Sequence, residues 1–158
     1  MKVRFPIYLY NPHLITIGNN FVAQRNLRLE AFQKTTDDTD LKITIKDNVH
    51  INWDVHIGAL DKIVIEDNVL IGSRVLITDH SHGRTEGTDL KLPPDTRPLY
   101  SKGPVIIHKN VWLGEGVCVM PGVTIGENTI VGANSVVTKS LPANCIAGGI
   151  PAKIIRYQ

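Results

Sequence analysis

Residues 105–137 read VIIHKNVWLGEGVCVMPGVTIGENTIVGANSVV, and within this stretch an aliphatic residue recurs at every sixth position. A second apolar register lies two residues before the first, through Val111, Val117 and Val123. Because residues i and i−2 of a strand share a face, each hexad is predicted to form a short strand with one inward face and one corner. The recurring residues are Ile107, Leu113, Val119, Ile125, Val131 and Val137.

The same spacing extends toward the N-terminus, so that the aliphatic positions form five groups of three. Three hexads close one triangular coil, and stacked coils bury columns of side chains that a single coil leaves exposed. The pattern therefore predicts an all-β parallel solenoid of about five coils. The earlier members of the repeat are Ile17, Ala23, Leu29, Ile45, Ile51, Ile57, Ile65, Ile71 and Ile77.

The repeat is interrupted in three places, each time after the third hexad of a coil. The next inward residue comes ten residues late after Leu29, two late after Ile57 and twenty-four late after Ile77. All three insertions therefore leave the same vertex of the triangular prism. We expect inserted loops at residues 32–42 and 81–103, and an unstructured loop as long as the second usually has a function.

Two residue types mark the corners between hexads. Glycine directly follows many inward residues, and asparagine stands three residues after many of them. Both types tolerate a positive φ, so we expect both to occupy left-handed corner conformations. The glycines are Gly58, Gly72, Gly114, Gly126 and Gly132, and the asparagines are Asn48, Asn68, Asn110, Asn128 and Asn134.

The 158 residues, 42% hydrophobic and with a formal net charge of +2, fit one compact domain. No basic run is present, which argues against a nucleic-acid partner. We expect a single domain over 1–158, with a cap at 1–14, coils over 15–137 and a tail over 138–158. Pro6 and Pro12 are expected to limit regular strand pairing in the cap.

The first residues lack the long apolar run of a secretion signal, and no stretch approaches the length of a transmembrane segment. We therefore expect a cytoplasmic protein. In loop 32–42, Asp37, Asp38 and Asp40 could bind a cation, but no glycine-containing calcium pattern accompanies them. A solvated polar loop is the favoured interpretation.

The hexads resemble the left-handed parallel β-helix of the hexapeptide-repeat acyltransferases. The stretch from Val111, VWLGEGVCVMPGVTIGENTIVGANSVVTKSLPANCIAGGIPAKIIR, is similar to the signature of the branch that contains the maltose, galactoside, nodulation and xenobiotic acetyltransferases. Residues 51–83, INWDVHIGALDKIVIEDNVLIGSRVLITDHSHG, look like the O-acetyltransferases of bacterial surface polysaccharides. The left hand is taken from this resemblance, since the general rule for parallel crossovers favours the right hand.

The resemblance implies direct transfer of an acetyl group from acetyl-CoA to a sugar hydroxyl, without a metal. Such a hydroxyl is protonated at neutral pH, and a histidine has a suitable pKa to act as its base. His80 matches the catalytic histidine of the family and comes three residues after Ile77, where the chain leaves the coil. Asp79, or a backbone carbonyl, could orient its imidazole, and His82 is the reserve base. His13, His50, His56 and His108 are interpreted as solvated surface histidines.

The resemblance also assigns residues to the two substrates. The amide of Glu115, after Gly114, matches a position near the thioester where an N–H can stabilise an oxyanion. Trp112 matches a tryptophan that orients the thioester or only packs, and Asn52 occupies an acceptor-contacting position, with Asp54 and His82 as further acceptor candidates. The remaining CoA-binding candidates are Gly132, Ala133, Thr138, Lys139, Lys153 and Arg156.

The expected assembly is a homotrimer with each active site between two subunits. A triangular prism leaves flat outer faces, and the long loop would expose Leu90, Leu92, Leu99 and Tyr100 if it stayed on its own short column. The acceptor is expected to be a small molecule or a glycan.

Three alternatives remain open. An N-acetyltransferase of amino-sugar nucleotides shares the fold and the donor. A zinc carbonic anhydrase on the same fold would need converging histidines, for which the sequence offers His80, His82 and His108. A purely structural solenoid would not require a proline-rich loop beside the histidines.

Overall fold

The computed structural model describes all 158 residues as one β-helix whose three sides are sheets of parallel strands, except that β21 joins its sheet antiparallel to β20. Side one is the sheet of strands that open each coil. Side two follows it along the chain and side three closes the coil. Side one contains β3 (Ile15–Ile17), β6 (Ile43–Ile45), β9 (Ile63–Ile65), β14 (Val105–Ile107) and β17 (Thr124–Ile125).

The other two sides contain more strands because an N-terminal strand joins each of them and the two C-terminal strands join side two. Side two contains β1 (Lys2–Val3), β4 (Val22–Ala23), β7 (His50–Ile51), β10 (Leu70–Ile71), β15 (Trp112–Leu113), β18 (Ile130–Val131), β20 (Cys145–Gly149) and β21 (Ala152–Tyr157). Side three contains β2 (Ile7–Tyr10), β5 (Leu27–Ala31), β8 (His56–Ala59), β11 (Leu76–Thr78), β16 (Cys118–Val119) and β19 (Val136–Val137).

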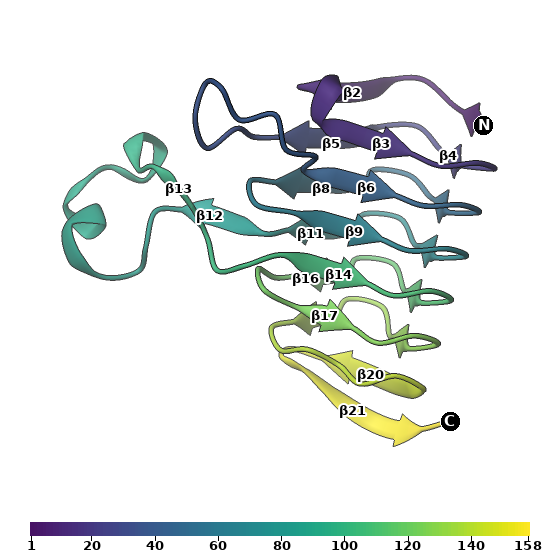
Figure 1. The fold of residues 1–158 in the computed structure, drawn as a ribbon. Helices are drawn as coiled ribbons and strands as arrows, with labels where there is room; N and C mark the ends of the chain where they lie inside the picture. The colour runs from purple at the N-terminus through teal and green to yellow at the C-terminus, as the bar shows by residue number, and fades with distance from the viewer.

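The coils wind in the left-handed sense. In Figure 1 the strands of side one run from left to right in front, and the chain returns behind them while it descends from the N-terminus. The predicted all-β, left-handed solenoid of five complete coils is confirmed. No helix in the structure has the length and apolar character needed to cross a membrane.

The interior consists of the aliphatic columns that the repeat predicts. Fourteen of the fifteen inward positions are buried, and only Ile17 is half-buried. Ile17 lies on β3, the terminal strand of side one, which has no strand above it. Each coil is therefore stabilised mainly by its neighbours, as burial of apolar surface requires.

The corners confirm the asparagine prediction and correct the glycine prediction. Asn48, Asn68, Asn110, Asn128 and Asn134 all have φ near 60°. The amide side chains of one such corner form a ladder from coil to coil, at 3.0, 3.2, 3.1, 2.9 and 2.8 Å. This ladder joins Asn20, Asn48, Asn68, Asn110, Asn128 and Asn144.

The glycines after the inward residues do not have positive φ, so that prediction is wrong. Three of them, Gly72, Gly114 and Gly126, are needed because the next coil approaches closely. A Cβ on Gly72 would lie 2.7 Å from the Glu115 nitrogen, and one on Gly114 would lie 2.7 Å from the Ala133 nitrogen. Such distances are shorter than real side chains allow, so a larger residue would push the coils apart.

The first residues are strands rather than an irregular cap. β1 pairs with β4, and all four residues of β2 pair in parallel with β5. Pro6 lies in the break between β1 and β2, and Pro12 follows β2, so both prolines lie where the regular pairing of these strands is interrupted. Residues 2–10 thus supply two sides of a further coil.

The three insertions leave the vertex between sides three and one, at the left edge in Figure 1. The longest is an arm rather than an unstructured loop. Its base pairs β12 (His80–His82) antiparallel with β13 (Leu99–Ser101), and its tip contains the short 3-10 helices η2 (Gly87–Lys91) and η3 (Pro94–Thr96).

Most of loop 32–42 is exposed, in line with its interpretation as a solvated polar loop, but its last residue is buried. The Lys42 side chain is 2% exposed, and its Nζ lies 2.7 Å from Asp38 Oδ2. Asp38 also accepts hydrogen bonds from the backbone N–H groups of Lys34 and Asp40. These contacts give the loop an ordered internal structure.

Candidate active site

His80 lies where the chain changes from the rigid coil to the arm. β11 ends at Thr78, and β12 begins at His80, which pairs with Ser101 of β13. The Thr78 hydroxyl donates a hydrogen bond to the His80 carbonyl over 3.1 Å. The imidazole is 12% exposed, so the ring is held at the surface of the coil rather than free in solvent.

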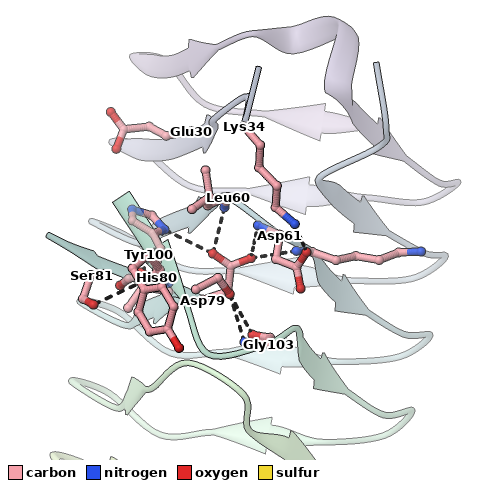
Figure 2. Close-up of polar contacts among 12 residues, drawn as sticks. Glu30, Lys34, Leu60, Asp61, Asp79, His80, Ser81, Tyr100 and Gly103 are labelled. Carbon is pink, nitrogen blue, oxygen red and sulfur yellow. Dashed lines mark hydrogen bonds and ion pairs between the residues drawn. The ribbon is translucent and has the colours of Figure 1, made fainter. Parts of the chain in front are cut away.

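Asp79 is fully buried, and its carboxylate connects the turn between β8 and β9 to His80. Its Oδ1 accepts the Leu60 N–H at 2.7 Å, and its Oδ2 accepts the N–H groups of Asp61 and Lys62 at 2.8 and 2.7 Å. Oδ1 also lies 3.1 Å from His80 Nδ1 (Figure 2). The turn between β8 and β9 therefore fixes the carboxylate, and the carboxylate fixes the histidine.

This arrangement determines which imidazole nitrogen is free. Three backbone donors satisfy an ionised carboxylate, and an ionised carboxylate can only accept hydrogen bonds. Nδ1 therefore carries the proton that it donates to Asp79, and Nε2 retains its lone pair. A histidine held in this tautomer is suited to accept a proton from a bound hydroxyl.

Two further contacts complete the surroundings of the ring. Phe32 packs edge-on against it with ring centroids 5.0 Å apart. Gly58, on β8, leaves the space that the ring occupies, because a Cβ there would lie 3.2 Å from His80 Cε1. The sequence did not point to Phe32, which lies in an insertion without a repeat pattern.

His56 does not lie free in solvent, which corrects its interpretation as a solvated histidine. Its Nε2 lies 2.8 Å from Glu30 Oε2, and Glu30 also accepts a 2.7 Å hydrogen bond from Arg28. Burial acts to raise the pKa of Glu30, but the hydrogen bonds from Arg28 and His56 outweigh it and lower the pKa below its ordinary value. The His56 and His80 rings both lie over Gly58, where the missing side chain leaves space, so the two rings are close to each other.

The other histidines do not converge on His80. His82 is exposed and makes no side-chain hydrogen bond, and His108 pairs with Glu66 at 3.0 Å. His13 and His50 are exposed. No group of three side chains in the structure is arranged to hold a metal ion.

His80 lies at the vertex between sides three and one. A groove of about 360 Å³ runs along a different vertex, between sides two and three. Its lining comes from successive coils and includes six of the predicted residues. The Trp112 side chain on β15 is half-exposed beside it. The predicted residues that line the groove are Asn52, Trp112, Gly114, Glu115, Gly132 and Ala133.

The backbone of this groove offers an unused donor. The Glu115 N–H makes no hydrogen bond within the chain, whereas the next residue, Gly116, donates to the Ser73 carbonyl. The Glu115 carboxylate forms an ion pair with Arg74. The side chain is therefore engaged away from the amide, which leaves the N–H available for a ligand.

The remaining predicted residues divide between the two vertices. Lys153 pairs with Gly148 beside the Gly132 end of the groove, and Arg156 pairs with Ile146 farther along the same hairpin. Thr138 and Lys139 follow β19 at the vertex of His80, two coils below it. Asp54 is exposed at a corner with φ 58° and accepts a hydrogen bond from Asn26.

Within one chain, side three separates the groove from His80. The groove precedes β11 and His80 follows it, so the two features lie at opposite ends of the same strand. Ser73 and His80 are seven residue steps apart along the chain, a span of up to about 23 Å when extended. A ligand that contacts both would have to cross this side or bridge two copies of the chain.

These features define a class of protein: a left-handed β-helix of hexapeptide coils with an aspartate-held histidine at one vertex and a groove at another. Comparison with known families agrees. Residues 104–139 match the model described as bacterial transferase hexapeptide (six repeats), and residues 62–81 match the hexapeptide repeat of succinyl-transferase.

The chain is 44% identical over 158 residues to a putative lipopolysaccharide biosynthesis O-acetyl transferase, WbbJ, of Escherichia coli K12, covering 98% of this chain and 77% of the relative. A maltose O-acetyltransferase of Clostridium difficile 630 superposes with a TM-score of 0.67 at 30% identity, over 99% of this chain and 65% of that one. A point variant of AntD, an N-acyltransferase of Bacillus cereus solved with dTDP-4-amino-4,6-dideoxyglucose and coenzyme A, gives a TM-score of 0.79 at 26% identity, over 99% and 79%. The chain belongs to the hexapeptide-repeat acetyltransferases.

Proposed function

We propose that the protein transfers an acetyl group from acetyl-CoA to a sugar hydroxyl during the synthesis of a cell-surface polysaccharide, with His80 as the general base. The observation that carries the proposal is the contact of His80 Nδ1 with the buried Asp79, which leaves Nε2 free to accept a proton. The relationship to WbbJ, whose name describes lipopolysaccharide O-acetylation, supports the choice of acceptor.

The chemistry proceeds in one transfer without a covalent enzyme intermediate. His80 Nε2 accepts the proton of the sugar hydroxyl while the sugar oxygen attacks the thioester carbonyl. The carbonyl oxygen becomes an oxyanion, for which the free Glu115 N–H is the donor. The intermediate collapses, the carbon–sulfur bond breaks, and the CoA thiolate takes the proton from His80. The products are an acetyl ester and CoA.

The placement of the residues supports a homotrimer with sites between subunits. His80 and the Glu115 amide lie at different vertices of one chain, so a neighbouring copy supplies the second half. In the arm, Leu90 and Leu92 are 54% and 44% exposed in the single chain, and a neighbour would cover them. Thr138 and Lys139 would then meet CoA from the His80 side, and Lys153 and Arg156 would meet it from the groove side.

An amino-sugar nucleotide is the second candidate acceptor. The resemblance to AntD, which was solved with an amino sugar linked to dTDP, favours it. An amine is a better nucleophile than a hydroxyl and depends less on a base. Loss of His80 would therefore reduce N-acetylation less than O-acetylation.

The test is a screen of CoA release from acetyl-CoA against sugars, amino sugars and their nucleotides, followed by two variants. With the best hydroxyl acceptor, His80→Ala is expected to lower kcat by roughly 10²- to 10⁴-fold with little change in the KM for acetyl-CoA. His82→Ala is the matched control, because His82 lies on the same strand with an exposed side chain that makes no hydrogen bond. A larger loss in His82→Ala than in His80→Ala would overturn the assignment of the base.

A further inference from the structure

The outer surface of side three carries aromatic and charged side chains above His80. Strand register aligns Tyr8 with Arg28 and His56, and aligns Tyr10 with Glu30 and Gly58. Tyr8 and Tyr10 are 56% and 53% exposed. Two columns of outward residues therefore lead from β2 toward His80: one ends at His56, and the other ends at Gly58, over which the His80 ring lies.

The polar residues of this surface are held in place before any ligand arrives. The Arg28 guanidinium donates to one oxygen of Glu30 at 2.7 Å, and His56 Nε2 contacts the other at 2.8 Å. Figure 2 shows that Glu30 lies above His80 and that both side chains are on the same side of the β-helix. The planar guanidinium and carboxylate thus present fixed hydrogen-bonding edges.

The aromatic residues join this surface to the proposed base. The Phe32 ring contacts His80 with centroids 5.0 Å apart and Tyr10 with centroids 5.6 Å apart. Neighbouring strands of a sheet are about 4.8 Å apart, so the step from Gly58 on β8 to Tyr10 on β2 is about 10 Å. That length exceeds what one pyranose ring at His80 would cover.

Two hollows flank Tyr10. One, of about 500 Å³, lies between Phe32, Thr35, Leu60 and Leu99 at the base of the arm. The other, of about 410 Å³, lies over Tyr8, Tyr10, Arg28 and Glu30. Sugars match this mixture, because their C–H faces pack on aromatic rings while their hydroxyls bond to planar polar groups at the edges.

We propose that Tyr8, Tyr10, Arg28, Glu30 and Phe32 form a platform that binds the sugar residue next to the one that is acetylated. The proposal rests on the proposed function, since it uses His80 to define which sugar reacts. It deepens that function by naming the acceptor class: a glycan of at least two linked residues rather than a monosaccharide.

The test is an array of mono- to tetrasaccharide fragments of bacterial surface polysaccharides, treated with the enzyme and radiolabelled acetyl-CoA. Binding of tagged protein is read on a duplicate array. Wild type is expected to label and bind fragments of two or more residues in preference to their terminal monosaccharides. Tyr10→Ala is expected to reduce that preference about three- to tenfold, the range for losing one aromatic stacking contact. Arg28→Gln provides a second variant at an exposed position.

Tyr157→Ala is the control, because Tyr157 is 63% exposed on β21, at the far end of the helix. It should leave the preference unchanged. Equal labelling of monosaccharides and longer fragments, an unchanged preference in both platform variants, or binding to no fragment would overturn the platform. A different outcome identifies failure of the proposed function alone: longer fragments bind and depend on Tyr10, but no acetyl label is incorporated.

Discussion

Asp79 is the residue on which the candidate site depends most, because it serves both the fold and the proposed base, His80. The sequence placed it beside His80 at the exit from a coil, and this adjacency was enough to suggest an orienting role. Its three backbone donors could not be predicted, since they come from a turn 17 to 19 residues earlier. Only the stacked coils bring that turn and the carboxylate together.

Asp79→Asn is expected to damage stability and activity together. The amide has one acceptor oxygen, so its NH₂ group would face a backbone N–H, and a buried unsatisfied donor costs about 1 to 3 kcal/mol. The same amide could no longer hold Nδ1–H of His80 as strongly, so kcat should fall. Thermal unfolding and kcat measured on one preparation test this, with Asp61→Asn as the control because its carboxylate does not contact His80. A fully active, fully stable Asp79→Asn enzyme would contradict the dual role.

Glu30, His56 and Phe32 show where prediction from residues alone fails. The repeat identified His56 as outward-facing, which is correct, but outward residues of different coils become neighbours only through strand register. Phe32 lies in an insertion whose path no periodicity specifies. The sequence could identify only those candidate residues that belong to a family motif or to the six-residue repeat.

At the scale of the structural elements, the corners give the clearest contrast between two residue types. Both asparagine and glycine were predicted from their tolerance of positive φ, and only asparagine uses it at these positions. Gly72, Gly114 and Gly126 are required by the approach of the next coil, a distance that no single coil reveals. The spacing therefore located the corners correctly, while the reason for glycine depends on the stack.

The asparagine ladder gives a stability prediction. Asn68 has φ 60° and connects Asn48 to Asn110 through its side chain. Asn68→Ala must hold a left-handed conformation that costs about 1 to 2 kcal/mol, and it also loses the ladder bonds. Asn68→Gly loses the same bonds but keeps the conformation at low cost. Thermal unfolding midpoints should rank wild type above Gly and Gly above Ala; equal losses in the two variants would contradict a conformational origin.

Loop 32–42 gives a pH-dependent prediction. Lys42 and the backbone N–H of Lys34 lower the pKa of Asp38 to about 2. In the unfolded chain an aspartate has a pKa of about 3.9. The ionised carboxylate therefore stabilises the folded state at pH values above about 3.9, and this contribution is lost as the pH falls toward 2.

The measurement compares unfolding of wild type and Asp38→Asn between pH 5 and pH 2. Wild type should be the more stable at pH 5, and the difference should shrink as the pH falls, because the other carboxylates are common to both proteins. A difference that stays constant across this range would show that the ion pair with Lys42 does not act through the charge of Asp38.

At the scale of the whole molecule, the repeat predicted the number of coils, the vertex of the insertions and the inward columns. It missed the two strands of the first partial coil, because Pro6 and Pro12 suggested irregular structure there. It also missed the ordered arm, whose antiparallel base depends on pairing between β12 and β13. The sequence did not predict that His80 and the groove are separated. This separation becomes visible only in the closed triangular cross-section, where side three lies between the two vertices.

The central claim is that one subunit supplies His80 and its neighbour supplies the groove. Two inactive variants test it directly: His80→Ala lacks the base, and Ala133→Trp fills the groove at an exposed position. Equal amounts are mixed, unfolded, refolded together and assayed for acetyl transfer. In a randomly assembled trimer each site needs an intact base from one subunit and an intact groove from the next, each with a probability of one half, so about one quarter of the wild-type activity should return. If both halves came from the same chain, no mixed assembly would contain a working site, and activity no higher than that of the separate variants would contradict the account.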